Sequence, residues 1–159
     1  MKTINSAPFA LAFVLFVFAI GAGAEDRQAP QDKATSNEHV TVYREPTCDC
    51  CIKWARYLRD RGFHVTIRNA TNMYAVRTAN RVPAGLASCH TALVEGYVVE
   101  GHVPVESVSR LLETRPDDVI GIAVPGMPIG SPGMEGPNPQ RYAVIAFHRD
   151  GRTSVFARY

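Results

Sequence analysis

The pattern of apolar and polar side chains predicts strands that alternate with helices. Residues 39–43 alternate as in a strand with one buried face, and residues 63–68 alternate in the same way. Between them, apolar side chains recur at helical spacing over residues 51–60, and Arg61-Gly62 provides a stop. Residues 69–80 can cap and form a second helix.

A hairpin and a third helix follow in the pattern. Residues 91–94 and 97–100 predict two strands joined by Glu95-Gly96 as a tight turn. Pro104 suits the first turn of a helix that runs to about Thr114. The predicted order is strand, helix, strand, helix, strand, strand, helix, with a parallel first pair and an antiparallel hairpin.

The character of the sequence changes after Pro116. Residues 124–139 are rich in proline and glycine and contain Met127 and Met134. Proline and glycine at this density interrupt both helices and strands, so the segment predicts an ordered or semi-ordered loop without regular structure.

Two apolar-rich segments near the C-terminus, residues 142–147 and 153–159, predict strands. Arg149-Asp-Gly-Arg152 joins them, and Asp-Gly is a common two-residue hairpin turn. We therefore expect a domain over residues 39–116 and a C-terminal extension, residues 117–159, packed on it.

The N-terminal pattern is typical of a secretory signal. Lys2 precedes the apolar stretch at residues 9–20, and Ala22-Gly23-Ala24 matches an A-x-A cleavage site. Residues 1–24 are thus a predicted signal peptide, and the polar residues 25–38 are a predicted disordered linker. An uncleaved membrane anchor is the alternative, although the stretch is short for a bilayer.

Composition and charge narrow the function classes. The chain has 17 Lys and Arg against 15 Asp and Glu, without a basic run, so nucleic acid is not an expected partner. Export would place the chain in an oxidising compartment, the periplasm of a Gram-negative host. We expect a monomer there that stays off the membrane after cleavage. Four cysteines in that compartment would ordinarily form two structural disulfides.

The spacing of the cysteines argues for other chemistry. Cys48, Cys50 and Cys51 lie where the first strand gives way to the first helix, and only Cys89 lies outside this cluster. A helix N-terminus favours thiolate, which is both a redox nucleophile and a soft metal ligand. Cys48 and Cys51 form a C-x-x-C pair, whereas Cys50 adds a thiol that favours a soft metal. From the spacing alone, metal binding and disulfide chemistry both remain open.

The order of elements, with a C-x-x-C pair at the first strand-to-helix junction, resembles the thioredoxin fold. In thioredoxin-like proteins, the residues just before the third strand pack over the redox pair. That stretch is Ser88-Cys89-His90-Thr91 in this chain. The resemblance therefore implies a fourth thiol, Cys89, close to the other three.

Four separated motifs carry a more specific resemblance. They are Tyr43-Arg-Glu-Pro-Thr-Cys-Asp-Cys-Cys51, Ser88-Cys-His-Thr91, Gly96-Tyr-Val-Val-Glu-Gly-His-Val-Pro104 and Ala123-Val-Pro-Gly-Met-Pro-Ile-Gly-Ser-Pro-Gly-Met-Glu-Gly136. Over about residues 39–159 the chain resembles the CopG-like family of periplasmic copper-resistance proteins. The resemblance implies an α/β thioredoxin-like mixed sheet flanked by helices, with a C-terminal Pro/Gly/Met loop and β-hairpin extension. It also implies copper held by cysteine sulfur. Many relatives carry Gly in place of Asp49.

The candidate metal ligands are soft donors, which suit Cu(I). They are Cys48, Cys50, Cys51, Cys89, Met134, Met127 and His90. Because the clustered cysteines are too crowded to surround one ion easily, we expect several copper ions bridged by cysteine sulfur. Zinc is the alternative metal.

The methionines and histidines each have a second interpretation. Met127 and Met134 can ligate copper or simply pack the loop. His90 should point away from Cys89 if that stretch is extended, but an irregular loop would allow it to reach the cluster. His102 is expected to be a surface or hydrogen-bonding histidine.

The sequence favours a periplasmic copper-binding redox protein that interconverts Cu(I) and Cu(II) in copper resistance. Its expected partners are copper ions and periplasmic copper efflux or chaperone proteins. The alternatives are a thiol–disulfide oxidoreductase, with Cys48 and Cys51 as its catalytic pair, a passive copper chaperone or buffer, and a structural disulfide module. Nothing in the sequence separates a redox enzyme from a buffer.

Overall fold

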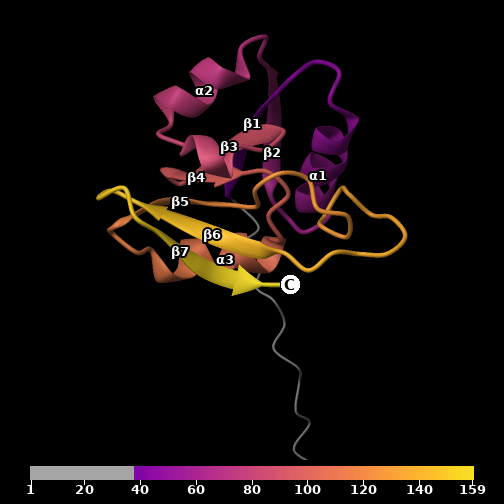
Figure 1. Cartoon of the computed structure of the whole chain (residues 1–159). Helices are drawn as coiled ribbons and strands as arrows, with labels where there is room; N and C mark the ends of the chain where they lie inside the picture. The colour runs from indigo at the N-terminus through magenta and orange to yellow at the C-terminus, as the bar shows by residue number, and fades with distance from the viewer. Residues whose placement is uncertain (1–37) are drawn as a thin grey trace, which may run out of the picture. The chain divides into compact units, whose positions relative to one another are not determined.

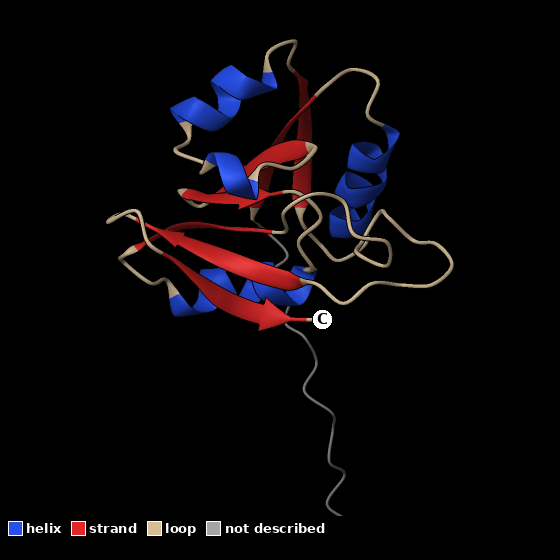
Figure 2. Ribbon diagram, in the orientation of Figure 1, coloured by secondary structure: helices blue, strands red, loops and turns tan. Residues whose placement is uncertain are grey.

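The computed structural model describes residues 38–159, which form a seven-stranded sheet and three α-helices (Figures 1 and 2). The expected signal peptide, residues 1–24, and residues 25–37 of the expected linker lie outside the described residues. Within the described part, no helix is long and apolar enough to cross a membrane.

The elements follow the predicted order as far as the third helix. They are β1 (His39–Arg44), α1 (Asp49–Arg59), β2 (His64–Asn69), α2 (Met73–Ala79), the short 3-10 helix η1 (Ala84–Leu86), β3 (His90–Val94), β4 (Tyr97–Glu100) and α3 (Val105–Thr114). The β3–β4 turn at Glu95-Gly96 has both residues at positive φ, as a tight hairpin turn requires.

The sheet is mixed, with the strand order β2-β1-β3-β4-β5-β6-β7. β1 and β2 are parallel, whereas β3 is antiparallel to both β1 and β4. Beyond β4 the same sheet continues through β5 (Val119–Ala123), β6 (Ala143–His148) and β7 (Thr153–Arg158). β5 is parallel to β4, and β6 and β7 form the predicted hairpin.

The sequence pattern does not predict β5, and the reason is its burial. Four of its five residues are buried, so the strand lacks the apolar–polar alternation that marks a half-exposed strand. Its pairing with β4 makes the C-terminal segment part of one sheet rather than an appendage.

One face of the sheet carries the main apolar core. Trp54 and Leu58 of α1 and Val108 and Leu111 of α3 belong to the same buried cluster as strand residues such as Val42. In α1 the buried positions follow helical spacing, and the Trp54 indole N–H donates to the carbonyl of Val103 at 2.9 Å. The core therefore fixes α1 against the segment that follows β4.

The opposite face carries a smaller apolar cluster. Val98, Ala123 and Phe147 form it, and Val82 and Leu86 from the segment around η1 pack against it. The neighbouring residues Val98 and Val99 thus face different cores, as the strand pleat requires.

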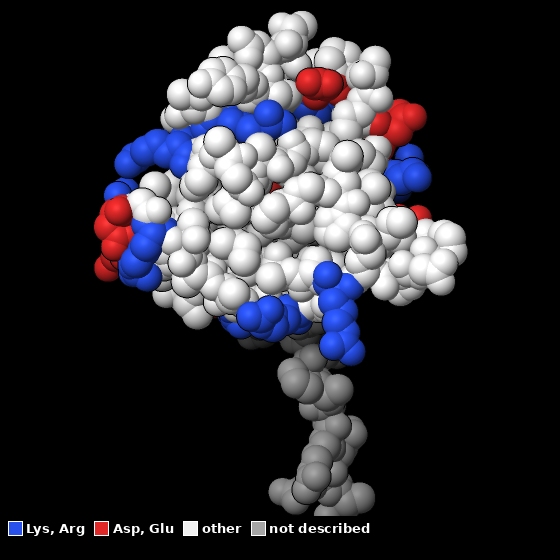
Figure 3. All heavy atoms as spheres, in the orientation of Figure 1, with Lys and Arg blue, Asp and Glu red and all other residues white. Residues whose placement is uncertain are grey.

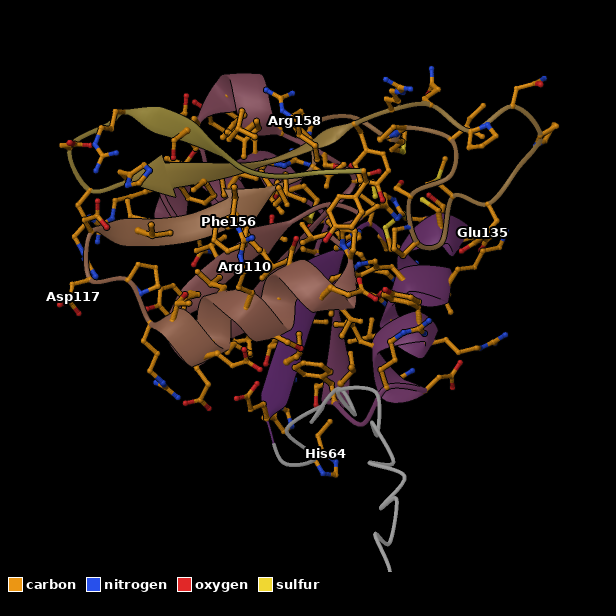
Figure 4. The ribbon with its side chains drawn as sticks, turned by 90° about the horizontal axis from the view of Figure 1, so that it is seen from below. His64, Arg110, Asp117, Glu135, Phe156 and Arg158 are labelled. Atoms are coloured by element: carbon orange, nitrogen blue, oxygen red, sulfur yellow. A yellow bond between two sulfur atoms is a disulfide. The ribbon has the colours of Figure 1, made fainter. Side chains whose placement is uncertain are left out.

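On the face drawn in Figure 3, Lys and Arg side chains form a band across the upper part, other charged side chains lie at the sides and the lower margin, and the centre is largely uncharged. Beside the outermost strand β7, Arg110 of α3 lies 3.8 Å above the ring of Phe156 and donates to the Phe156 carbonyl (Figure 4). Among residues 38–159, the acidic or basic side chains of Glu100, with no exposed area, and Arg44, with 8%, are buried instead. Both lie beside the segments that carry the cysteines.

The β4–β5 contact has no room for a side chain at Gly121. A Cβ there would lie 2.1 Å from the Val98 carbonyl oxygen and 2.7 Å from the Phe147 ring. We expect Gly121→Ala to lower the free energy of unfolding by about 1–3 kcal/mol, as overpacking does. Gly85→Ala is the control, because nothing lies within 4 Å of a Cβ at that position. Equal denaturant midpoints for the two variants would contradict the expectation.

Candidate metal centre

The candidate centre lies at the edge of the sheet where β1 and β4 end and β3 begins. Arg44, the last residue of β1, is paired with His90, the first residue of β3. On the other side, Thr91 of β3 is paired with Glu100, the last residue of β4. Three segments therefore meet at these strand ends: the cysteine cluster follows β1, Cys89 precedes β3, and His102 follows β4.

Arg44 orders the loop between β1 and α1. One guanidinium nitrogen donates to the carbonyls of Glu45, Pro46 and Cys48 at 2.9, 3.0 and 3.0 Å. Cys48 is the N-cap residue of α1, and its side chain makes no capping hydrogen bond. Its sulfur therefore makes no hydrogen bond to the backbone N–H groups at the start of the helix.

The structure brings the four cysteine sulfurs together, all within 4.8 Å of one another. Cys48 and Cys51 form a disulfide, whereas Cys50 and Cys89 are free thiols. The Cys50 sulfur lies 3.4 Å from that of Cys48 and 3.8 Å from that of Cys89. Cys89 and Cys51 are therefore close in space, although 38 residues separate them in the sequence.

Two imidazoles extend this cluster on the side of Cys89. The Cys89 sulfur lies 2.9 Å from Nε2 of His102 and 3.2 Å from Nδ1 of His90. Nδ1 of His102 lies 2.7 Å from the carbonyl oxygen of Pro132, which can only accept a hydrogen bond. Nδ1 therefore carries the proton of the neutral ring, and the Nε2 lone pair faces Cys89. A backbone carbonyl orients metal-ligating histidines in this same way.

Burial keeps these groups uncharged. His90 and His102 have no exposed area, and burial lowers the pKa of both rings, that of His90 further. Burial also raises the pKa of the Cys89 thiol, and the neighbouring Cys50 raises it further. Nε2 of His90 has no hydrogen-bond partner among the described residues. The centre thus offers sulfur and neutral nitrogen donors with little charge of their own.

The expectation for His102 was correct only in part. The ring is hydrogen-bonded, but it is buried against Cys89 rather than at the surface. The predicted hairpin already contained the signal that would place His102 near Cys89, because a two-residue turn fixes the register of the two strands. Val94 pairs with Tyr97 and Thr91 with Glu100, and the same register places position 89 opposite position 102.

The Pro/Gly loop lies directly against the start of α1. A Cβ at Gly133 would lie 2.9 Å from the Trp54 backbone nitrogen and 3.0 Å from the Cys50 carbonyl oxygen. The Glu135 carboxylate accepts from the Gly133 N–H at 2.6 Å, and Figure 4 shows Glu135 on this loop beside α1. The loop therefore packs against the backbone of α1 beside Cys50.

The two methionines occupy different positions in this loop. Met134 is half-buried, and it follows Gly133 at the contact with α1. Met127 is 52% exposed, and it follows Gly126, whose carbonyl accepts from the Ser88 hydroxyl. Each methionine is thus close in sequence to a contact with a cysteine-bearing segment.

The fold and the site together define the class: an α/β protein with a mixed sheet and a cluster of four cysteines at the ends of its central strands. The family described as "Protein of unknown function, DUF411" matches residues 86–134. Among curated proteins, no match to the chain was found.

Two solved structures are similar over nearly their whole length, and both are described as copper resistance protein CopG. Form 2 is 41% identical with a TM-score of 0.74, and the match covers 77% of this chain and 98% of that one. Form 1 is 42% identical with a TM-score of 0.72, and the match covers 76% and 96%. The chain belongs to the CopG-like copper-resistance family.

The contact of the loop with α1 can be tested at Gly133. Both Gly133 and Gly151 have positive φ, +81° and +85°, but only Gly133 has backbone atoms at its Cβ position. Alanine at either position carries the left-handed penalty of about 1–2 kcal/mol. We expect Gly133→Ala to cost roughly 1–3 kcal/mol more than Gly151→Ala through overpacking. Chemical denaturation measures the difference, and equal losses would show that the loop yields freely.

Proposed function

We propose that the chain is a copper-binding protein of the periplasm whose centre holds several Cu(I) ions bridged by cysteine sulfur. Cys48, Cys50, Cys51 and Cys89 are the proposed sulfur ligands. The observation that carries the proposal is the convergence of their four sulfur atoms within 4.8 Å. The names of the similar structures, copper resistance proteins, support copper as the metal.

The donor set fits Cu(I) in its chemistry. Thiolate sulfur is a soft ligand and selects Cu(I), while neutral imidazole also suits copper. Cys89, His90 and His102 form a second cluster within 4.8 Å, and it shares Cys89 with the first. More donors converge than one tetrahedral ion uses, which favours several ions over a single zinc. We propose His90 and His102 as nitrogen ligands on the side of Cys89.

The Cys48–Cys51 disulfide bears on how the centre would be loaded. Sulfur in a disulfide is not a thiolate, and thiolate is the form that binds metal. Reduction of this bond by two electrons would therefore free two of the four proposed ligands. When bound, copper would supply the one-electron chemistry between Cu(I) and Cu(II) that we propose for copper resistance. The protein would supply the ligands and the buried surroundings.

A thiol–disulfide oxidoreductase is the second candidate, and the same disulfide favours it. Cys48, before the first turn of α1, would be the nucleophile, and Cys51 would resolve the mixed disulfide. Such an exchange has no use for Cys50 or for the contact between Cys89 and the buried His102. A passive copper buffer would use the same ligands as a redox protein, and turnover separates the two.

The remaining parts of the proposal concern fold and setting. We infer a thioredoxin-like unit from β1 to α3, supported by the parallel β1–β2 pair, the antiparallel β3–β4 pair and the C-x-x-C at the first strand–helix junction. Secretion through residues 1–24 would deliver it to the periplasm as a monomer. Copper efflux or chaperone proteins would be its partners there.

A copper titration tests the proposed function. The reduced chain, without residues 1–24, is expected to bind more than one Cu(I) ion and to hold them more tightly than zinc. Cys50→Ser should weaken copper binding at least as much as Cys48→Ser, because a sulfur-bridged cluster uses both. A chelator competition with metal analysis measures stoichiometry and affinity. If Cys50→Ser binds copper normally while the protein reduces disulfide substrates, the oxidoreductase is the correct function.

The methionines of the loop provide a separate test. Met127→Leu/Met134→Leu keeps size and apolarity but removes both thioether sulfurs, which are neutral ligands for Cu(I). We expect the double variant to remain folded, with an altered copper absorption spectrum and faster copper loss to a chelator. The single variants assign the effect to one sulfur. An unchanged spectrum and an unchanged release rate would mean that these methionines only pack.

A further inference from the structure

Glu100 is an acidic residue with no exposed area, and two of its hydrogen-bond partners lie on either side of Cys89 in the sequence. Its carboxylate accepts from the Ser88 backbone N–H at 2.7 Å and from the Thr91 hydroxyl at 2.6 Å. Ser88 directly precedes Cys89, and Thr91 is two residues beyond it. One buried carboxylate thus binds the chain on both sides of this cysteine.

Arg77 of α2 completes the arrangement. Its Nε donates to the Glu100 carboxylate at 3.0 Å, and a terminal nitrogen donates to the carbonyl of Ser88. Both backbone groups of Ser88 are therefore held, the N–H by Glu100 and the carbonyl by Arg77. Arg77 thus joins α2, which carries none of the proposed ligands, to the end of β4 and to the residue before Cys89.

Gly101, the residue after Glu100, also packs closely against the segment around Cys89. Gly101 has positive φ, and a Cβ there would lie 2.4 Å from the Ser88 hydroxyl oxygen. Its N–H donates to the carbonyl of His90 at 2.9 Å. Glu100, Gly101 and His102 thus each contact the Ser88–Thr91 segment, and His102 reaches the Cys89 sulfur itself.

An ion pair with a buried carboxylate is not an efficient way to stabilise a fold. The desolvation of Glu100 offsets much of its attraction to the half-buried Arg77, and apolar side chains of similar volume often serve stability equally well. Directional hydrogen bonds do fix a backbone segment, which apolar packing does not. The pattern of donors around Glu100 is therefore better suited to holding one loop in one position than to adding stability.

We propose that the Glu100–Arg77 pair is a positioning device for Cys89, which sets the copper affinity of the centre without contacting the metal. The inference rests on the proposed function, since it concerns the same site. Partners that orient metal ligands typically contribute about 10–100-fold to affinity. Glu100 would act through the backbone on either side of the ligand rather than through the ligand side chain.

The test compares Glu100→Gln with Asp118→Asn. Asp118 accepts from His148 at 3.0 Å and pairs with Arg152, but it lies before the start of β5, at the opposite end of the sheet from Glu100. We expect Glu100→Gln to weaken Cu(I) binding about 10–100-fold in a chelator competition. Asp118→Asn should bind copper as the unmodified chain does.

A second measurement needs no copper. In the fully reduced protein, the alkylation rates of Cys89 and Cys51 are followed separately by peptide mass spectrometry. General destabilisation would raise both rates, because Cys51 is buried in α1. Release of the Ser88–Thr91 segment by Glu100→Gln should raise the rate of Cys89 selectively. Thr91→Val, which removes one donor and keeps the shape, should produce a smaller change of the same kind and remains informative if Glu100→Gln does not fold.

The outcomes separate this inference from the function on which it rests. An unmodified chain that binds no copper would overturn the proposed function. An unmodified chain that binds copper, beside Glu100→Gln and Thr91→Val proteins with unchanged copper affinity and unchanged Cys89 alkylation, would overturn the positioning role. A rise in both alkylation rates together would also overturn it, because that result describes stability alone.

Discussion

The pairing of the central strands at one edge of the sheet is the constraint on which the centre depends. β1 and β4 end beside the start of β3, and β5, parallel to β4, ends beside Glu100. Four connections therefore meet at this edge: the cysteine cluster, the segment before β3, the segment with His102, and the Pro/Gly loop. The loop begins there because the Val124 N–H donates to the Glu100 carbonyl at 3.0 Å. Backbone hydrogen bonds between the strands thus decide which side chains can meet.

Strand register brings the donors together only approximately, and buried polar contacts supply the rest. Arg44 holds the carbonyls around Cys48, and Glu100 holds the residues on either side of Cys89. The carbonyl of Pro132 determines which nitrogen of His102 faces the cluster. Each of these contacts pairs a backbone or ring atom close to a cysteine with a fixed hydrogen-bond partner. The same contacts that satisfy the buried polar groups also orient the donors.

The sequence predicts the parts of this arrangement that have a local signature. Alternation and helical spacing identify the elements up to α3, and the C-x-x-C with its extra thiol identifies the cluster. β5 has no such signature, because a strand buried on both faces does not alternate. Glu100 also escapes prediction, since an acidic residue at a strand end is ordinarily solvated. His102 is predictable in part: the hairpin register gives its position opposite Cys89, but only the fold shows that its ring is buried there.

Burial also disfavours four thiolates at this site that have no cation bound to them. Four neighbouring thiolates would repel one another, and burial already raises the pKa of Cys89, which favours its neutral form. Two ways of removing that charge use the same atoms: a disulfide removes two thiols, and a bound cation takes the place of a thiol proton. The Cys48–Cys51 disulfide is the first way. Because the neutral rings of His90 and His102 add donors without adding charge, several monovalent ions could balance the sulfurs while all four remained ligands.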